Sequence, residues 1–140
     1  DTTKKHAVLI AWLFCAVAYE DRFINPIHFS YRNQSIGDRG VIKQIFEHED
    51  YGIRQWPQGQ TFIQHYLKNT QNKKGLIIDA GANIGASAVY FLELYQNSFV
   101  YTIEPDGKNH QLLSINTERY SNKKNFHGAI AGEDGVLYLE

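Results

Sequence analysis

The chain has 140 residues, of which 43% are hydrophobic and 21% are charged, and its formal net charge is −1. This composition is ordinary for a globular domain with a buried core, so it excludes a disordered tail. The near-neutral charge, without an extended basic stripe, argues against a nucleic-acid partner.

The amino-terminal segment pairs two positive charges with an apolar stretch. Lys4 and Lys5 precede apolar residues over 7–19, and these 13 residues are fewer than the roughly 20 that a membrane-spanning helix needs. We expect a buried helix that packs on the sheet or on a partner. A targeting or anchoring segment that contacts a membrane is the less favoured alternative. Cys15 is the single cysteine, which excludes an internal disulfide and favours a cytoplasmic protein.

Residues 21–37 are mixed in character and predict a loop or irregular arm. Asp38 is then expected to cap a helix that runs to about Glu49, because apolar residues recur there at helical spacing. A second short helix is predicted to end before Asn69. Residues 1–70 are therefore predicted to form an amino-terminal helical and irregular extension.

The pattern changes after residue 70, where short apolar runs alternate with amphipathic stretches. Strands are expected near 76–78, 99–103 and 126–130, and helices over 84–95 and 106–120. Strands separated by single helices indicate parallel pairing, and uninterrupted apolar runs indicate burial on both faces. Residues 71–140 thus predict an α/β fold, a Rossmann-like doubly wound parallel sheet that is incomplete. A last strand over 136–139 is expected to pair antiparallel beside the third strand.

The turn after the first of these strands carries the chemistry that we expect. It reads Asp79-Ala80-Gly81-Ala82-Asn83-Ile84-Gly85. Gly81 lets the backbone turn tightly and approach a ligand, and Gly85 lets the next helix begin close to the sheet. The acidic Asp79 immediately before the turn, an upstream buried strand and a downstream amphipathic helix raise this pattern above a chance pair of glycines, so the turn predicts a nucleotide-type cofactor site.

Glu104 ends the second predicted strand and is followed by Pro105, which stops strand pairing. A carboxylate at that position can accept hydrogen bonds from both hydroxyls of a ribose. Its separation from Gly81 is about the 20 residues expected for a ribose-binding acid. Glu104 is therefore the predicted ribose contact.

The composition of the turn favours one adenosine cofactor over another. A dinucleotide fingerprint needs a glycine where this chain has Asn83. S-adenosylmethionine has no phosphate but carries an ammonium and a sulfonium, and Asp79 supplies negative charge near that end. We therefore expect S-adenosylmethionine. An NAD-dependent oxidoreductase with a degenerate dinucleotide site stays open, as does a binding module that has lost catalysis.

The segment Ile77 to Ser87, followed by Thr102-Ile103-Glu104-Pro105-Asp106, resembles the FkbM family of methyltransferases, and the likeness extends over residues 37–139. The resemblance implies a class I methyltransferase fold and methyl transfer to an oxygen of a small molecule or sugar. It also implies that Asp79, Gly81, Asn83 and Gly85 surround the methionine part of the cofactor, with Ala80 and Pro105 counted among the cofactor-binding residues.

The resemblance further implies that Gly128, Ala129 and Ile130 lie against adenine, without the Asp that many methyltransferases place there. The lysine and acidic cluster that normally follows in the family is not found before Glu140. The catalytic residues and the acceptor pocket are therefore expected in a part of the protein beyond this chain. No metal site is expected, because the six histidines show no pair at metal-ligand spacing.

Overall fold

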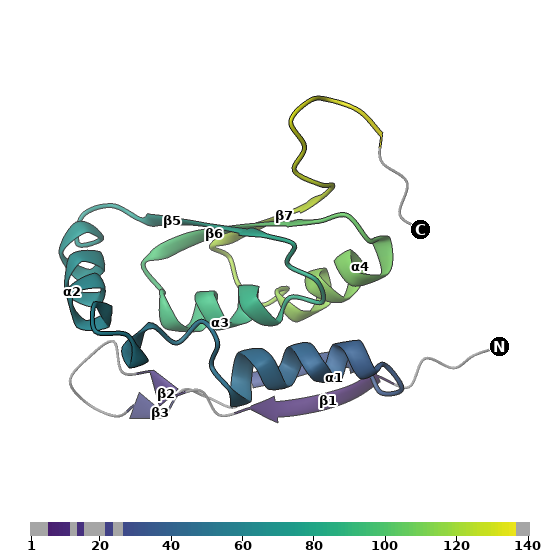
Figure 1. Ribbon diagram of the computed structural model, residues 1–140, viewed down its shortest axis with the longest axis horizontal. Coiled ribbons are helices and arrows are strands. Elements are labelled where there is room, and N and C mark those ends of the chain that lie inside the picture. The colour runs from purple at the N-terminus through teal and green to yellow at the C-terminus, as the bar shows by residue number, and fades with distance from the viewer. Residues whose placement is uncertain (1–5, 12–13, 16–21, 24–26, 137–140) are drawn as a thin grey trace.

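The computed structural model describes residues 6–11, 14–15, 22–23 and 27–136 (Figure 1). Its carboxyl-terminal part is a parallel three-stranded sheet of order β5-β6-β7. The strands are β5 (Gly75–Ala80), β6 (Ser98–Glu104) and β7 (Lys123–His127), and they are connected by α3 (Ala86–Leu94) and α4 (Gly107–Asn116). The predicted α/β, Rossmann-like fold is confirmed.

The boundaries of these elements follow from a few local residues. Strand β6 ends at Glu104, immediately before Pro105, and Asp106 then caps α4 by accepting hydrogen bonds from the backbone N–H groups of Lys108 and Asn109. The sequence predicted a longer α4 and a third strand displaced toward the carboxyl terminus. Both differences arise at element ends, where the periodic pattern is weakest.

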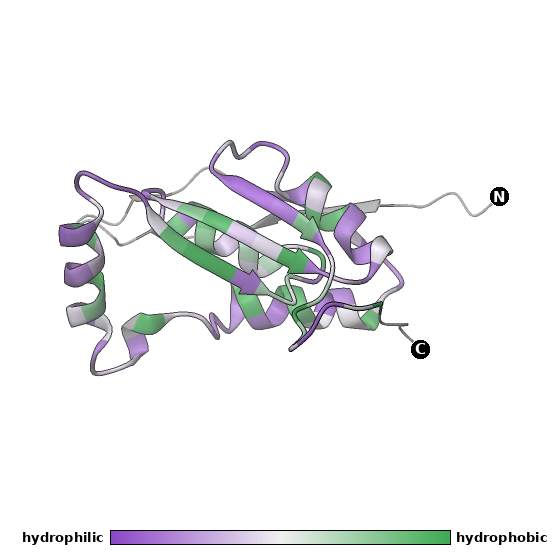
Figure 2. Ribbon diagram, turned by 90° about the horizontal axis from the view of Figure 1, so that it is seen from above, coloured by the Kyte–Doolittle hydropathy of each residue, from purple (hydrophilic) through white to green (hydrophobic). Residues whose placement is uncertain are grey.

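Helices α3 and α4 lie on the same side of the sheet (Figure 1). On the other face, Leu76 is 63% exposed and Ile78 is 60% exposed, and Figure 2 views the sheet from this side, with hydrophobic residues along β5. The expected burial of both faces is therefore not found, because no described element packs against the second face. The predicted strand over 136–139 lies outside the described residues except for Val136, which is not in a strand.

The amino-terminal part differs most from expectation. Strand β1 (His6–Ala11) pairs antiparallel with β4 (Ile27–Arg32), and β2 (Phe14–Cys15) pairs with β3 (Arg22–Phe23). The helix predicted over 7–19 is wrong for its described residues; the others lie outside the described part. The irregular arm predicted over 21–37 is also wrong, because it contains β3 and β4. In β4, Ile27 and Phe29 are buried while His28 is exposed, which is the alternation of a strand with one buried face.

The next segment is helical, as predicted, but begins earlier. Helix α1 (Ile36–Ile42) continues directly into the π-helix η1 (Lys43–Glu47), and its N-cap is Ser35. Asp38 is not the cap: it is 2% exposed and binds Arg32. A 3-10 helix, η2 (Ile53–Gln55), leads to α2 (Gly59–Asn69), which matches the second predicted helix.

The main hydrophobic core joins the two parts of the chain. It lies between β4 and α1 on one side and α3 and α4 on the other, and its largest members are Ile27, Phe29, Ile42, Ile45, Ile84, Val89, Tyr90 and Leu112. The amino-terminal part therefore covers the helices that support the predicted turn. None of the helices in the described ranges has both the length and the hydrophobicity to cross a bilayer.

Candidate functional site

The turn after β5 is a bend with three residues in the left-handed region of backbone space. The φ angles are 83° at Gly81, 51° at Asn83 and 92° at Gly85. Asparagine is one of the few non-glycine residues that adopt this conformation readily. The N–H groups of Gly81 and Ala82 both donate to the carbonyl oxygen of Ile103, at 2.8 and 3.1 Å. Strand β6 therefore fixes the course of the bend.

The two glycines of the bend meet different surroundings. A Cβ atom at Gly85 would lie 3.0 Å from Cδ1 and 3.2 Å from Cα of Leu113, on α4. A Cβ atom at Gly81 would meet nothing within 4 Å. Gly85 thus permits the close approach of α4, whereas Gly81 borders open space where a ligand can approach the backbone.

Glu104 points into the bend. Its Oε2 accepts a hydrogen bond from the backbone N–H of Asn83 at 2.7 Å, and its Oε1 accepts one from the N–H of Asp106 at 2.9 Å. The side chain is buried, with 5% of its surface exposed. Because each carboxylate oxygen has two lone pairs, both can still accept a further hydrogen bond.

Asp79 lies at the carboxyl end of β5 and is also buried, at 7% exposed. Its Oδ2 accepts a hydrogen bond from the hydroxyl of Ser87 at 2.7 Å. Burial raises the pKa of Asp79, and nearby Glu104 raises it further, against a lowering by the Ser87 bond. Two neighbouring carboxylates that have no ion pair with a cationic side chain among the described residues favour a positively charged ligand. The site residues predicted from the sequence did not include Ser87.

The end of β7 lies beside Glu104. The N–H of Gly128 donates to the backbone oxygen of Glu104 at 3.1 Å, and the Nε2 atom of His127 lies 3.0 Å from the oxygen of Pro105. Ala129 and Ile130 follow and are exposed. Ala80 is also exposed. The carboxyl ends of all three strands therefore meet at one edge of the sheet, as the predicted site requires.

Two features of this edge were not predicted. The rings of His110 and His127 stack with centroids 5.0 Å apart, and burial, together with the adjacent His127, lowers the pKa of His110 despite the charge of Glu104.

The second feature is Asn116, which is 5% exposed and connects α4 to β4 and to the bend. Its Oδ1 accepts from the N–H of Ser30, and its Nδ2 donates to the oxygens of Ser30 and Ile84. A lone asparagine in a helix gave no signal of such contacts.

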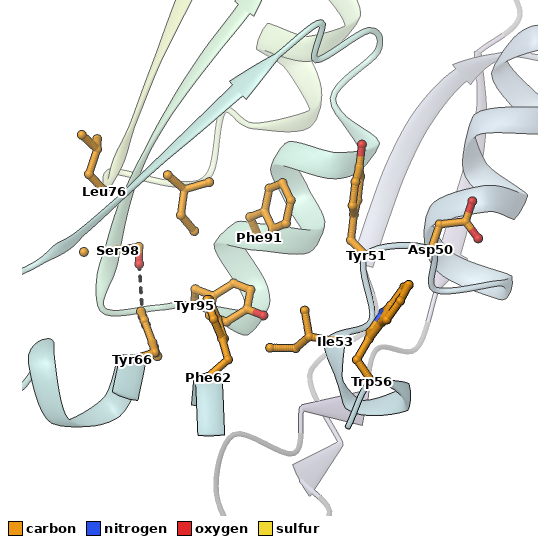
Figure 3. Close-up of a pocket in the computed structure, with 12 residues that line it drawn as sticks. Asp50, Tyr51, Ile53, Trp56, Phe62, Tyr66, Leu76, Phe91, Tyr95 and Ser98 are labelled. Atoms are coloured by element: carbon orange, nitrogen blue, oxygen red, sulfur yellow. Dashed lines mark hydrogen bonds between the residues drawn. The ribbon is translucent and has the colours of Figure 1, made fainter. Parts of the chain in front are cut away.

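A cavity of about 390 Å³ lies elsewhere, against the amino-terminal halves of β5 and β6 (Figure 3). Aromatic side chains of the loop before η2, of α2 and of α3 line it, and a hydrogen bond between Ser98 and Tyr66 lies at one side. It includes none of the predicted cofactor residues.

Within the described part of the chain, no three His, Cys, Asp or Glu side chains lie close enough together to form a metal site.

No family model matches the chain, and no curated protein is significantly similar to it in sequence. Among solved structures, one of "putative transferase PH0793" from Pyrococcus horikoshii is similar over 91% of this chain, with 12% sequence identity and a TM-score of 0.49. The chain spans 37% of the length of that protein. This likeness does not identify an activity, and the resemblance to FkbM methyltransferases stays a prediction.

Proposed function

We propose that this chain is the cofactor-binding part of an S-adenosylmethionine-dependent methyltransferase that acts on an oxygen of a small molecule or sugar. The observation that carries the proposal is the contact between Glu104 and the bend, with Oε2 of the carboxylate 2.7 Å from the backbone nitrogen of Asn83. An acid that ends one strand thus borders the glycine bend that leaves its neighbour. One adenosine-bearing molecule can lie across both.

The residues at this edge fit the chemistry of the cofactor. Glu104 keeps free lone pairs for the two ribose hydroxyls, and the open space beside Gly81 leaves room for the methionine part. When bound, S-adenosylmethionine supplies an activated methyl group. The chain's own residues bind the cofactor and orient it, and the proposal assigns no catalytic group to them.

Charge favours this cofactor over a dinucleotide. Asp79 and Glu104 are buried and close enough that their charges interact, so a ligand with an ammonium and a sulfonium relieves their repulsion. NAD would bring two phosphates to the same edge, where they would add negative charge. The acceptor class comes from the resemblance alone, and a cytoplasmic location stays a prediction based on the single Cys15.

Titration calorimetry of the purified protein with S-adenosylmethionine, S-adenosylhomocysteine and NAD tests the proposal. We expect both sulfur-containing ligands to bind and Glu104→Ala to weaken them by about 1.5–3 kcal/mol, the range for hydrogen bonds to a charged group. Glu118→Ala is the matched control, because Glu118 is exposed on the same chain and has no described side-chain contact. Circular dichroism establishes that each variant is folded.

Three results would contradict the proposal. Unchanged affinity in Glu104→Ala would remove Glu104 from the site. Thermal stabilisation by NAD, without stabilisation by either sulfur-containing ligand, would indicate an oxidoreductase instead. Failure of a folded protein to bind any of the three ligands would indicate a binding module that keeps the fold without the cofactor.

A further inference from the structure

Arg32, at the end of β4, is held rigidly by a buried acid. Its Nε and Nη2 atoms donate to Oδ2 and Oδ1 of Asp38 at 2.9 and 2.6 Å, and its backbone N–H donates to Oδ2 at 2.8 Å. Burial alone would raise the pKa of Asp38, but the hydrogen bonds from Arg32 and Ser35 hold it below its ordinary value. Asp38 is therefore a charged anchor that fixes the direction of the guanidinium group.

The same guanidinium reaches the first turn of α4. Nη2 of Arg32 donates to Oδ1 of Asn109 at 2.8 Å. The backbone N–H of Asn109 is in turn bound by the side chain of Asp106, the N-cap of the helix, at 2.8 Å. The backbone N–H of Asp106 is one of the two donors that hold Glu104. A continuous series of hydrogen bonds thus connects β4 to the carboxylate.

We infer that Arg32 is a positioning residue for Glu104, and that it sets how strongly the site recognises a ribose. This inference rests on the proposed function. Arg32 fixes the first turn of α4, so that the N–H of Asp106 holds Oε1 in place while the N–H of Asn83 holds Oε2. Without the bond to Asn109, one of the two donors that orient the carboxylate loses its support.

A guanidinium group at position 32 suits this role better than the ammonium group of a lysine would. A planar guanidinium can bind both oxygens of Asp38 and a third acceptor in one fixed arrangement, whereas an ammonium is a compact charge on a flexible stem. The side chain of Arg32 is 39% exposed, so its Coulomb attraction is weakened by solvent. Its effect on Glu104 therefore comes from geometry and not from charge at a distance.

The test measures recognition of the ribose separately from binding as a whole. Dissociation constants are measured by calorimetry for S-adenosylhomocysteine and for its 2′-deoxy analogue, and their ratio reports the hydroxyl contact. We expect the wild-type protein to favour the ribose ligand by at least about tenfold, as for a hydrogen bond to a charged group. Arg32→Lys and Asn109→Ala should each reduce this ratio by about threefold or more, with affinity for the deoxy ligand nearly unchanged.

Two matched variants control for general damage. Asn109→Asp keeps an acceptor oxygen for Arg32 and should retain the wild-type ratio. Arg39→Met removes another arginine of the same region, whose side chain donates to the backbone oxygen of Asn33 and, among the described residues, to no part of the predicted site, and it should also leave the ratio unchanged. Urea unfolding of each variant establishes that the protein measured is folded.

The outcomes separate the inference from the function on which it rests. A wild-type protein that binds neither ligand, or binds both equally, would overturn the assignment of Glu104 and with it the role of Arg32. A wild-type protein that discriminates, together with Arg32→Lys and Asn109→Ala variants that discriminate equally well, would overturn the inference alone. Equal weakening of both ligands would also overturn it, because it would mean that Arg32 has only a structural role.

Discussion

Replacement of Gly85 by alanine should destabilise the protein because the new methyl group has neither the conformation nor the space that it needs. The φ angle of 92° lies in the left-handed region, and the Cβ atom would lie 3.2 Å from the Cα atom of Leu113. The neighbour is backbone as well as side chain, so it cannot simply rotate away. Helix α3 or α4 would have to shift.

The expected loss combines three contributions. A left-handed alanine costs roughly 1–2 kcal/mol, and crowding in a packed interior costs about 1–3 kcal/mol. The smaller entropy of the unfolded alanine chain offsets about 0.4–1 kcal/mol. The net loss is about 3 kcal/mol, which is a large fraction of the roughly 5–15 kcal/mol that stabilises a typical domain.

Gly81→Ala is the matched control, because it introduces the same strain without the collision. Its φ is 83°, but no atom lies within 4 Å of the added Cβ, so we expect a loss of only about 1 kcal/mol. Urea unfolding measures both values from the shift in midpoint. Ligand binding should show the reverse order, with Gly81→Ala the more damaging of the two, because its methyl group enters the open space that the proposed function assigns to the cofactor.

Equal losses of stability in the two alanine variants would refute this reasoning, since they would mean that the contact with Leu113 does not constrain residue 85. A Gly81→Ala variant that binds S-adenosylhomocysteine as well as wild type would refute the prediction about ligand binding. The open space beside Gly81 would then be ordinary solvent and not part of the site.

Two further predictions concern buried polar groups. Asn116→Leu should lower the free energy of unfolding by about 1–3 kcal/mol or more, because it leaves the N–H of Ser30 unpaired, and a urea midpoint within error of wild type would contradict this. Asp79→Asn should bind S-adenosylhomocysteine more weakly and yet be more stable near pH 7. Burial raises the folded pKa of Asp79, so the wild-type protein loses stability as pH rises from about 4, the unfolded pKa, through that raised value. Urea unfolding measured from about pH 4 to pH 7 would contradict the prediction if the wild-type protein gained stability relative to the variant as the pH rises.

The centre of the predicted site could be derived from the sequence because it depends on neighbours along the chain. A buried strand, a bend rich in glycine and a strand that stops before Pro105 are local patterns, and parallel pairing brings their ends together. The position of Glu104 beside the bend followed from these patterns. The left-handed conformation of Asn83 is also a local feature, because it belongs to the same bend.

The supporting contacts could not be derived, because they join residues far apart in the chain. Asn116 binds Ser30 across 86 positions, and Arg32 binds Asn109 across 77 positions. Neither contact leaves a periodic trace in the sequence. The amino-terminal strands were missed for a related reason: a short apolar run fits a helix or a strand, and only the distant partner β4 decides that β1 is a strand.

The two acids of the proposed site should differ in what they do for the fold, because their hydrogen-bond donors differ. Glu104 accepts hydrogen bonds from two backbone N–H groups, so its orientation is already fixed in the folded protein. Ligand binding therefore carries no further cost for ordering this side chain. Asp79 is buried with one hydroxyl donor, Ser87, in the described structure, so its charge is poorly compensated there, and the proposed ligand would supply the missing positive charge. Removal of Glu104 should therefore reduce stability and affinity together, whereas neutralisation of Asp79 should raise stability while it reduces affinity. Opposite effects on stability together with a loss of affinity at both positions are what the proposed site for a positively charged adenosine ligand predicts, whereas a purely structural pair would leave the affinity unchanged.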